Sequence, residues 1–128
     1  MRSTFMLLLL IPFFSSSYAN EYENGHELLS NCKAAVNMMD RIPTSGSALK
    51  AGYCMGLIQG MSDMNTIYSV ISSTSSSSND IYICVPDKTP TGQLTRDVVN
   101  FLEKNPDDLY RPYSVLISAA LATNYPCN

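Results

Sequence analysis

The sequence has little of the chemistry that enzymes and nucleic-acid-binding proteins use. Its 128 residues include one histidine, His26, and only 8 lysines and arginines against 11 aspartates and glutamates. The basic residues form no cluster, whereas a protein that neutralises nucleic-acid phosphates needs a basic face. We therefore expect no nucleic-acid partner.

Catalytic motifs are also missing. A nucleophile needs a base within hydrogen-bond reach and a group that orients that base. The segment Gly60-Met61-Ser62-Asp63-Met64 departs from the G-x-S-x-G motif at its last position, and no glycine-rich phosphate loop is present. His26 is expected at the start of a helix, and Asp107-Asp108 in a first helical turn, where negative charge is favourable. We expect no enzymatic activity and no cofactor.

Long apolar runs are absent beyond the N-terminus. Residues 1–19 begin with Met1-Arg2, continue with an apolar run and end with small residues at Ser17 and Ala19, which is typical of a cleaved signal peptide. The remaining segment, 20–128, is one domain of 109 residues with a net charge of −4. No part of it approaches the ~20 apolar residues of a membrane helix. We predict a soluble, exported domain in the periplasm.

All four cysteines lie in this exported domain: Cys32, Cys54, Cys84 and Cys127. An even number of cysteines in a small exported domain predicts disulfides. A metal site is not favoured, because there is no C-x-x-C pair and His26 has no ligand-like spacing to a cysteine. The methionines at 38, 39, 55, 61 and 64 could bind cuprous ion, but core packing is the favoured interpretation.

Apolar periodicity predicts an all-α fold of four to five helices. The first helix is expected to start after Asn24 as N-cap, with an apolar face over 27–40, and the second covers about 48–71 after a break at 41–46. Thr89-Pro90 opens a third helix that stops at Asn105-Pro106, and a fourth covers 106–124 with a bend at 111–112. The expected inward residues include Met64, Ile67, Tyr68 and Ile71 of the second helix and Leu109, Val115, Leu116, Ala119 and Ala120 of the fourth.

The positions of the breaks predict how the cysteines pair. The midpoint of 32 and 54 falls in the first break, and the midpoint of 84 and 127 falls at Asn105-Pro106. Helices that fold back about these breaks bring each pair to the same height. We predict Cys32–Cys54 and Cys84–Cys127, one bridge for each helical hairpin.

Two features have alternative interpretations. Gly52, Gly56 and Gly60 form a strip on the second helix, which permits close approach of a helix from the same chain or from a second copy. Packing within the chain is the favoured interpretation. The serine-rich loop 72–80 is typical of a flexible linker between the two hairpins, but loops on rigid scaffolds also carry function.

Several segments together carry a resemblance. Cys54-Met55-Gly56-Leu57-Ile58-Gln59-Gly60, Cys84-Val85-Pro86-Asp87, Gly92-Gln93-Leu94, Phe101-Leu102-Glu103-Lys104-Asn105-Pro106 and Tyr125-Pro126-Cys127 follow in an order that resembles the Rap/Tai family. Members of that family are small periplasmic immunity proteins against peptidoglycan amidases delivered by type VI secretion.

The resemblance implies a helical homodimer that binds an amidase with a papain-like Cys/His site and blocks its cleft with a protruding loop. The position of the serine-rich segment then suggests the effector-binding residues, namely Ser73, Thr74, Ser75, Ser76, Ser77, Ser78, Asn79 and Asp80. A periplasmic chaperone or stress protein and a small-ligand carrier are the alternative functions.

Overall fold

The computed structural model describes residues 24–42, 47–74 and 83–127. Within these ranges the chain forms four α-helices, α1 (Gly25–Met39), α2 (Ser47–Thr74), α3 (Thr91–Lys104) and α4 (Tyr113–Asn124), and a short 3₁₀ helix, η1 (Pro106–Asp108). Strand pairing among the described residues is limited to isolated bridges. The predicted all-α fold is confirmed.

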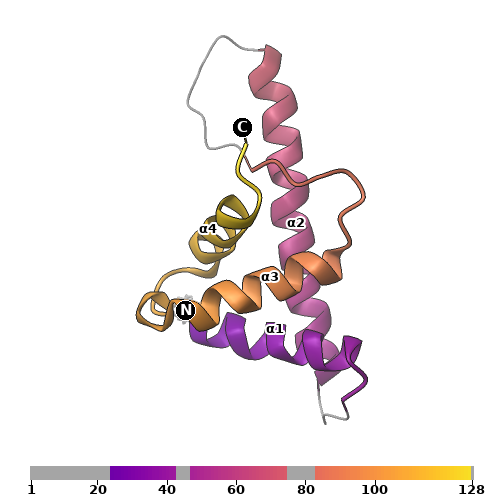
Figure 1. Cartoon of the computed structure of the whole chain (residues 1–128), viewed down its shortest axis with the longest axis vertical. Helices are drawn as coiled ribbons and strands as arrows, with labels where there is room; N and C mark the ends of the chain where they lie inside the picture. Colours follow the sequence, from indigo (N-terminus) through magenta and orange to yellow (C-terminus); the bar gives the residue numbers. More distant parts are fainter. Residues whose placement is uncertain (1–23, 43–46, 75–82, 128) are drawn as a thin grey trace, which may run out of the picture.

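The helices pack around the lower half of α2. Helices α1 and α3 lie side by side across it, and α4 packs against α3 (Figure 1). The centre of the core is formed by large side chains from all four helices, among them Leu28, Ile58, Leu94, Val98, Leu102, Leu116, Ile117 and Leu121. Each helix therefore buries one apolar face against the others, which is the main source of stability in a small helical domain.

Both predicted disulfides are present. Cys32 and Cys54 join α1 to α2 in the core, where both residues are fully buried. Cys84 joins Cys127 near the C-terminus, and there Cys84 is exposed. One bridge is therefore part of the hydrophobic core, whereas the other ties together two peripheral segments.

The start of α1 depends on a side-chain cap and on a glycine. The carboxamide oxygen of Asn24 accepts hydrogen bonds from the backbone N–H groups of His26 and Glu27, as an N-cap residue does. Gly25 then lies against the turn after η1, and its N–H donates to the carbonyl of Arg111. A Cβ built on Gly25 would lie 2.9 Å from the Cα of Leu109, so only glycine fits without displacing the backbone.

The predicted start of the third helix and the predicted course of the fourth are wrong. Helix α3 begins at Thr91 with Pro90 as its cap, because Thr89 uses its hydroxyl to donate to the carbonyl of Pro86. The fourth predicted helix is interrupted rather than bent: η1 ends at Asp108, and α4 begins only after Pro112. Proline has no N–H to continue the helical bonds, and the carbonyl of Arg111 instead bonds to α1.

This interruption changes which face of α4 is buried. Leu109, Leu116 and Ala120 are buried as predicted and Ala119 is partly buried, but Val115 is exposed. Ile117 and Leu121, which the continuous helical pattern did not select, complete the buried face. Because the chain is not helical at residues 109–112, the apolar period before the break does not continue in register after it. A helical pattern drawn across the break therefore predicts the wrong buried face of α4.

Helix α2 is much longer than its neighbours. Its 28 residues span about 42 Å, whereas the 15 residues of α1 span about 22 Å. The upper half of α2 therefore extends past α1 and α3 (Figure 1). The prediction that Met64, Ile67, Tyr68 and Ile71 face inward is wrong, because all four side chains are exposed at a level where no other helix reaches.

We expect Gly25→Ala to destabilise the domain. The added methyl group meets backbone atoms of Leu109, and overpacking of this kind costs about 1–3 kcal/mol of unfolding free energy. Gly52→Ala is the matched control, because a Cβ there meets nothing within 4 Å and alanine favours helix by about 0.5–1 kcal/mol. Urea denaturation of both variants measures the difference, and an unchanged midpoint for Gly25→Ala contradicts the close approach.

Candidate partner-binding surface

The exposed half of α2 carries five of the large apolar side chains that the described part of the fold leaves in contact with solvent. We call this group the distal surface, and it comprises Met64, Ile67, Tyr68, Val70 and Ile71. Each of these residues is about half exposed or more, up to 62 % for Met64 and Val70. Contiguous apolar side chains on the surface of a small domain are typical of a protein–protein interface.

The distal surface also has very little charge. Between Asp63 and Asp87 the sequence contains one charged residue, Asp80. The hydroxyl groups of Thr66 and Ser69 bond back to carbonyls of α2, those of Ser62 and Thr66 respectively, which satisfies their polarity within the helix. The buried centre of a protein–protein interface typically contains few charged residues and is enriched in tyrosine and methionine. The distal surface has this composition.

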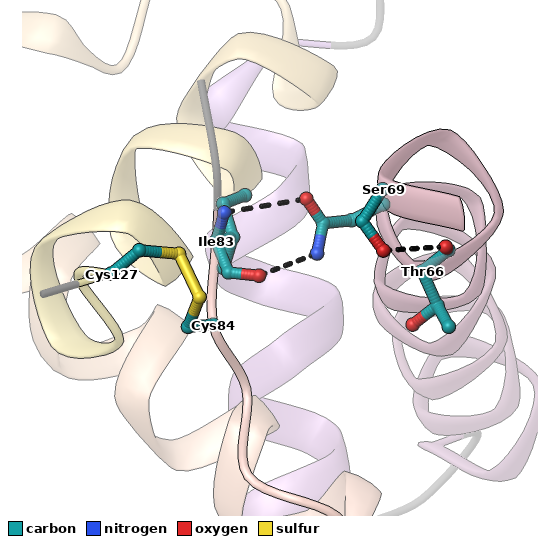
Figure 2. Close-up of a disulfide and its surroundings, with 6 residues drawn as sticks. Thr66, Ser69, Ile83, Cys84 and Cys127 are labelled. Atoms are coloured by element: carbon teal, nitrogen blue, oxygen red, sulfur yellow. Dashed lines mark hydrogen bonds between the residues drawn. A yellow bond between two sulfur atoms is a disulfide. The ribbon is translucent and has the colours of Figure 1, made fainter. Parts of the chain in front are cut away.

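A side chain of α2 anchors the chain where it returns to the described part of the fold. The amide group of Asn65 donates to the carbonyl of Ile83 at 2.6 Å, and its oxygen accepts from the N–H of Ile83 at 3.4 Å. This pair of bonds imitates the pairing of one β-strand residue with another. Figure 2 shows Ile83 held between this amide on α2 and the disulfide on its other side.

The C-terminus holds the same segment from the opposite side. Ile83 forms an isolated antiparallel bridge with Pro126, and the N–H of Cys84 donates to the carbonyl of Tyr125 at 2.9 Å. The Cys84–Cys127 disulfide makes this pairing covalent. Residues 83 and 84 therefore have a fixed place relative to both α2 and α4.

Tyr125 continues this network to α3. Its hydroxyl donates to the carboxylate of Asp97 at 2.5 Å, and Gln93 donates to the other oxygen of that carboxylate. Burial, together with the hydrogen bond to Asp97 and its negative charge, raises the pKa of Tyr125 to about 12. The neutral side chain of Tyr125 therefore helps to position the C-terminal segment.

The residues predicted to bind an effector divide between two parts of the chain. Ser73 and Thr74 lie in the last turn of α2, so the prediction that the helix ends at residue 71 is wrong by three residues. Ser75, Ser76, Ser77, Ser78, Asn79 and Asp80 lie outside the described residues. Asn65 was not among the predicted site residues, although a polar residue on the core-facing side of a helix was a visible signal.

The glycine strip does not have the predicted internal partner among the described residues. A Cβ built on Gly52, Gly56 or Gly60 meets no atom within 4 Å, and all three glycines are exposed. Packing of the strip against a helix of the same chain is therefore wrong for the described part of the fold. The alternative, a second copy of the chain, stays open.

Other predicted features have structural roles. Asp108 pairs with Arg111 at 2.8 Å within the turn that follows η1, and His26 is an exposed residue in the first turn of α1. In the ranges that the structure describes, no three His, Cys, Asp or Glu side chains gather as a metal site would require. None of the described helices is both long and apolar enough to cross a membrane.

Comparison with known families identifies the class of protein. A family model of Rap1a immunity proteins matches residues 24–127, from the N-cap of α1 to the last cysteine. The chain belongs to this family of immunity proteins. No curated protein and no solved structure matches it significantly.

We expect Asn65→Ala to loosen the anchor of residues 83 and 84. Loss of the two hydrogen bonds leaves the backbone groups of Ile83 with fewer partners, at a cost of about 1–3 kcal/mol. Urea denaturation measures this loss, and hydrogen exchange at the amide of Cys84 should become faster. Asn100→Ala, at an exposed position on α3, is the control and should change neither quantity.

The stability of the protein should decrease at alkaline pH because of Tyr125. Its pKa is raised from 10 in the unfolded chain to about 12 in the folded one, so its contribution is complete below pH 10 and is lost between pH 10 and 12. Ultraviolet titration should show one tyrosine that ionises near pH 12 and is missing in Tyr125→Phe. An identical titration of the two proteins contradicts the Asp97 hydrogen bond.

Proposed function

We propose that this protein inhibits a peptidoglycan amidase that type VI secretion delivers into the periplasm, and thereby protects the producing cell and its siblings. The observation that carries the proposal is the family match, which extends over all the described helices. The motif order in the sequence supports an amidase with a papain-like Cys/His site as the effector. The protein acts by binding, and catalyses no reaction itself.

We further propose that residues 1–19 are a signal peptide, that the exported chain 20–128 acts in the periplasm, and that it forms a homodimer. The two disulfides support an oxidising compartment. The exposed glycine strip and distal surface support a partner on α2.

In our proposal the segment from Ser73 to Asp80 occludes the amidase cleft. Two features support it: the segment begins at the far end of the longest helix, and its other end is followed by a segment anchored through Asn65 and the Cys84–Cys127 disulfide. A segment held at both ends costs less entropy on ordering than one held at a single end. Serine hydroxyls and the Asp80 carboxylate supply hydrogen bonds to polar groups around the catalytic centre, and Asp80 can pair with a histidinium there.

The length of the segment limits how it can be tested. Ile83 bonds to Asn65, and Thr74 lies nine residues further along α2, which is about 13.5 Å. Residues 75–82 can span roughly 30 Å when extended, but removal of five of them would leave a reach of only about 14 Å. Deletion of three residues leaves about 20 Å and so spares the anchor.

We expect deletion of residues 76–78 to weaken inhibition at least about tenfold, since the shortened segment enters the cleft less deeply. The assay is hydrolysis of peptidoglycan sacculi by a papain-like Cys/His amidase that the intact protein inhibits. The length-matched control replaces Ser76, Ser77 and Ser78 by glycine, which preserves the reach and separates it from the hydroxyl chemistry. Thermal unfolding should be nearly unchanged in both variants. Full inhibition by the deletion variant refutes occlusion by this segment.

A further inference from the structure

The two disulfides have opposite surroundings. Cys32 and Cys54 are both 0 % exposed and belong to the hydrophobic core, so we call their disulfide the core bridge. Cys84 is exposed, Cys127 is partly exposed, and neither is a member of that core, so we call their disulfide the accessible bridge. A thiolate must reach a sulfur atom before it can open a disulfide. In the folded domain, the accessible bridge is therefore the one that an external thiolate reaches.

The helices are held together without the accessible bridge. The core contains large side chains from all four helices, and the core bridge links α1 to α2 inside it. The accessible bridge instead joins the segment before α3 to the segment after α4. Its opening leaves the apolar contacts between the helices in place. The accessible bridge can therefore break in a local opening while the core stays folded.

Few other contacts join the two segments that the accessible bridge connects. Ile83 pairs with Pro126, but proline has no N–H group and donates no hydrogen bond in return. The described backbone pairing then consists of one hydrogen bond, from the N–H of Cys84 to the carbonyl of Tyr125. The disulfide is thus the strongest described link between residues 83 and 84 and the C-terminal segment.

Opening of the accessible bridge changes how residues 83 and 84 are held. The amide of Asn65 on α2 bonds to the backbone of Ile83 on one side, and the disulfide lies on the other side (Figure 2). Reduction leaves the Asn65 contact in place and removes the covalent one. Residues 83 and 84 then pass from an anchor on two sides to an anchor on one side.

We propose that the accessible bridge is a thiol–disulfide exchange site: a protein dithiol opens it, residues 83 and 84 lose one of their two anchors, and the core bridge stays closed. The partner is a reductant of the thioredoxin class, which presents one reactive thiolate and a second thiol that resolves the intermediate.

Where it concerns inhibition, the proposal rests on the function proposed above. The proposed effector-binding segment precedes this anchor, and a segment held at one end costs more entropy to order than one held at both. The redox state of the accessible bridge therefore sets the affinity for the effector, with the disulfide form binding more tightly.

The exchange takes two steps and transfers two electrons. The attacking thiolate forms a bond to Sγ of Cys84, the more exposed cysteine, and the disulfide bond breaks with its electron pair on Sγ of Cys127, which takes up a proton. The second thiol of the reductant then attacks the mixed disulfide as a thiolate, and Cys84 leaves and is protonated. Both cysteines are reduced to thiols, and the dithiol, which supplied the two protons, is oxidised to a disulfide.

Selective reduction of the exported chain 20–128 is the first test. Dithiothreitol in native buffer, followed by alkylation and peptide mapping, should open the accessible bridge at least about a hundredfold faster than the core bridge, because the buried sulfurs are reached only after unfolding. Circular dichroism at the same times should show unchanged helix content. Simultaneous opening of both bridges, or no opening of the accessible bridge before the helices unfold, overturns the proposal.

A thioredoxin whose second active-site cysteine is replaced by serine tests the point of attack. It cannot complete the second step, so it should stay joined to Cys84, and mass spectrometry of the linked peptides identifies the cysteine. The variant with both Cys84→Ser and Cys127→Ser is the matched control, since it keeps the core bridge and should form no adduct. Linkage to Cys127 alone, or an equal yield of adduct with the control, contradicts the assignment.

The same double variant tests the consequence for the anchor. Hydrogen exchange at the amide of residue 84 should become at least about tenfold faster, because its remaining hydrogen bond opens more often. The faster exchange should not depend on low concentrations of urea, since a local opening exposes little surface. Unchanged exchange, or exchange that accelerates with urea as global unfolding does, refutes the local loosening.

Inhibition is measured with the double variant rather than with a reductant, which would also act on the cysteine of the effector. The variant should inhibit a papain-like amidase at least about threefold more weakly than the intact protein does. If the intact protein inhibits no such amidase, the proposed function fails, whereas selective opening and the Cys84 adduct still support the exchange site. If the variant inhibits as well as the intact protein, control of binding by the bridge is overturned and the proposed function stands.

Discussion

The length of α2 is the constraint on which the rest of the structure depends. Its first half meets the other helices and contributes Cys54 and Ile58 to the core, where the bridge to Cys32 holds it against α1. Its second half extends beyond them with exposed apolar side chains. A helix that propagates past its own core must have its far end supported by other means, because isolated helical turns are marginally stable in water.

The contacts that hold the chain beside α2 above the core include a small set of polar and covalent ones, which reach α2 at Asn65. The Asn65 amide, the Cys84–Cys127 disulfide and the backbone of Tyr125 together hold the returning chain beside α2, and Tyr125 is in turn bonded to Asp97. A fixed frame of this kind lowers the entropic cost of presenting a segment to a partner. The anchored chain beside α2 is therefore consistent with the effector binding that we propose for this protein.

Much of the fold could be predicted from the sequence. The two disulfide pairings followed from the breaks at 41–46 and Asn105-Pro106, because a hairpin brings residues equidistant from its turn to one height. The sequence-based predictions were wrong where a tertiary contact overrode a local helix rule. The fourth helix was predicted as one bent helix, but the carbonyl of Arg111 accepts a hydrogen bond from the N–H of Gly25, and the resulting break moved Val115 to the surface.

The sequence by itself determined the secondary structure class, the disulfides and the family, since these depend on periodicity, on turn residues and on motif order along the chain. Which apolar face of α2 is buried was decided only by the tertiary structure. Cys54 and Ile58 look no more apolar than Ile67 and Ile71, yet the first pair lies at the height of α1 and α3 and the second pair does not. Burial depends on what stands opposite a side chain, and periodicity along one helix contains no information on where the neighbouring helices end.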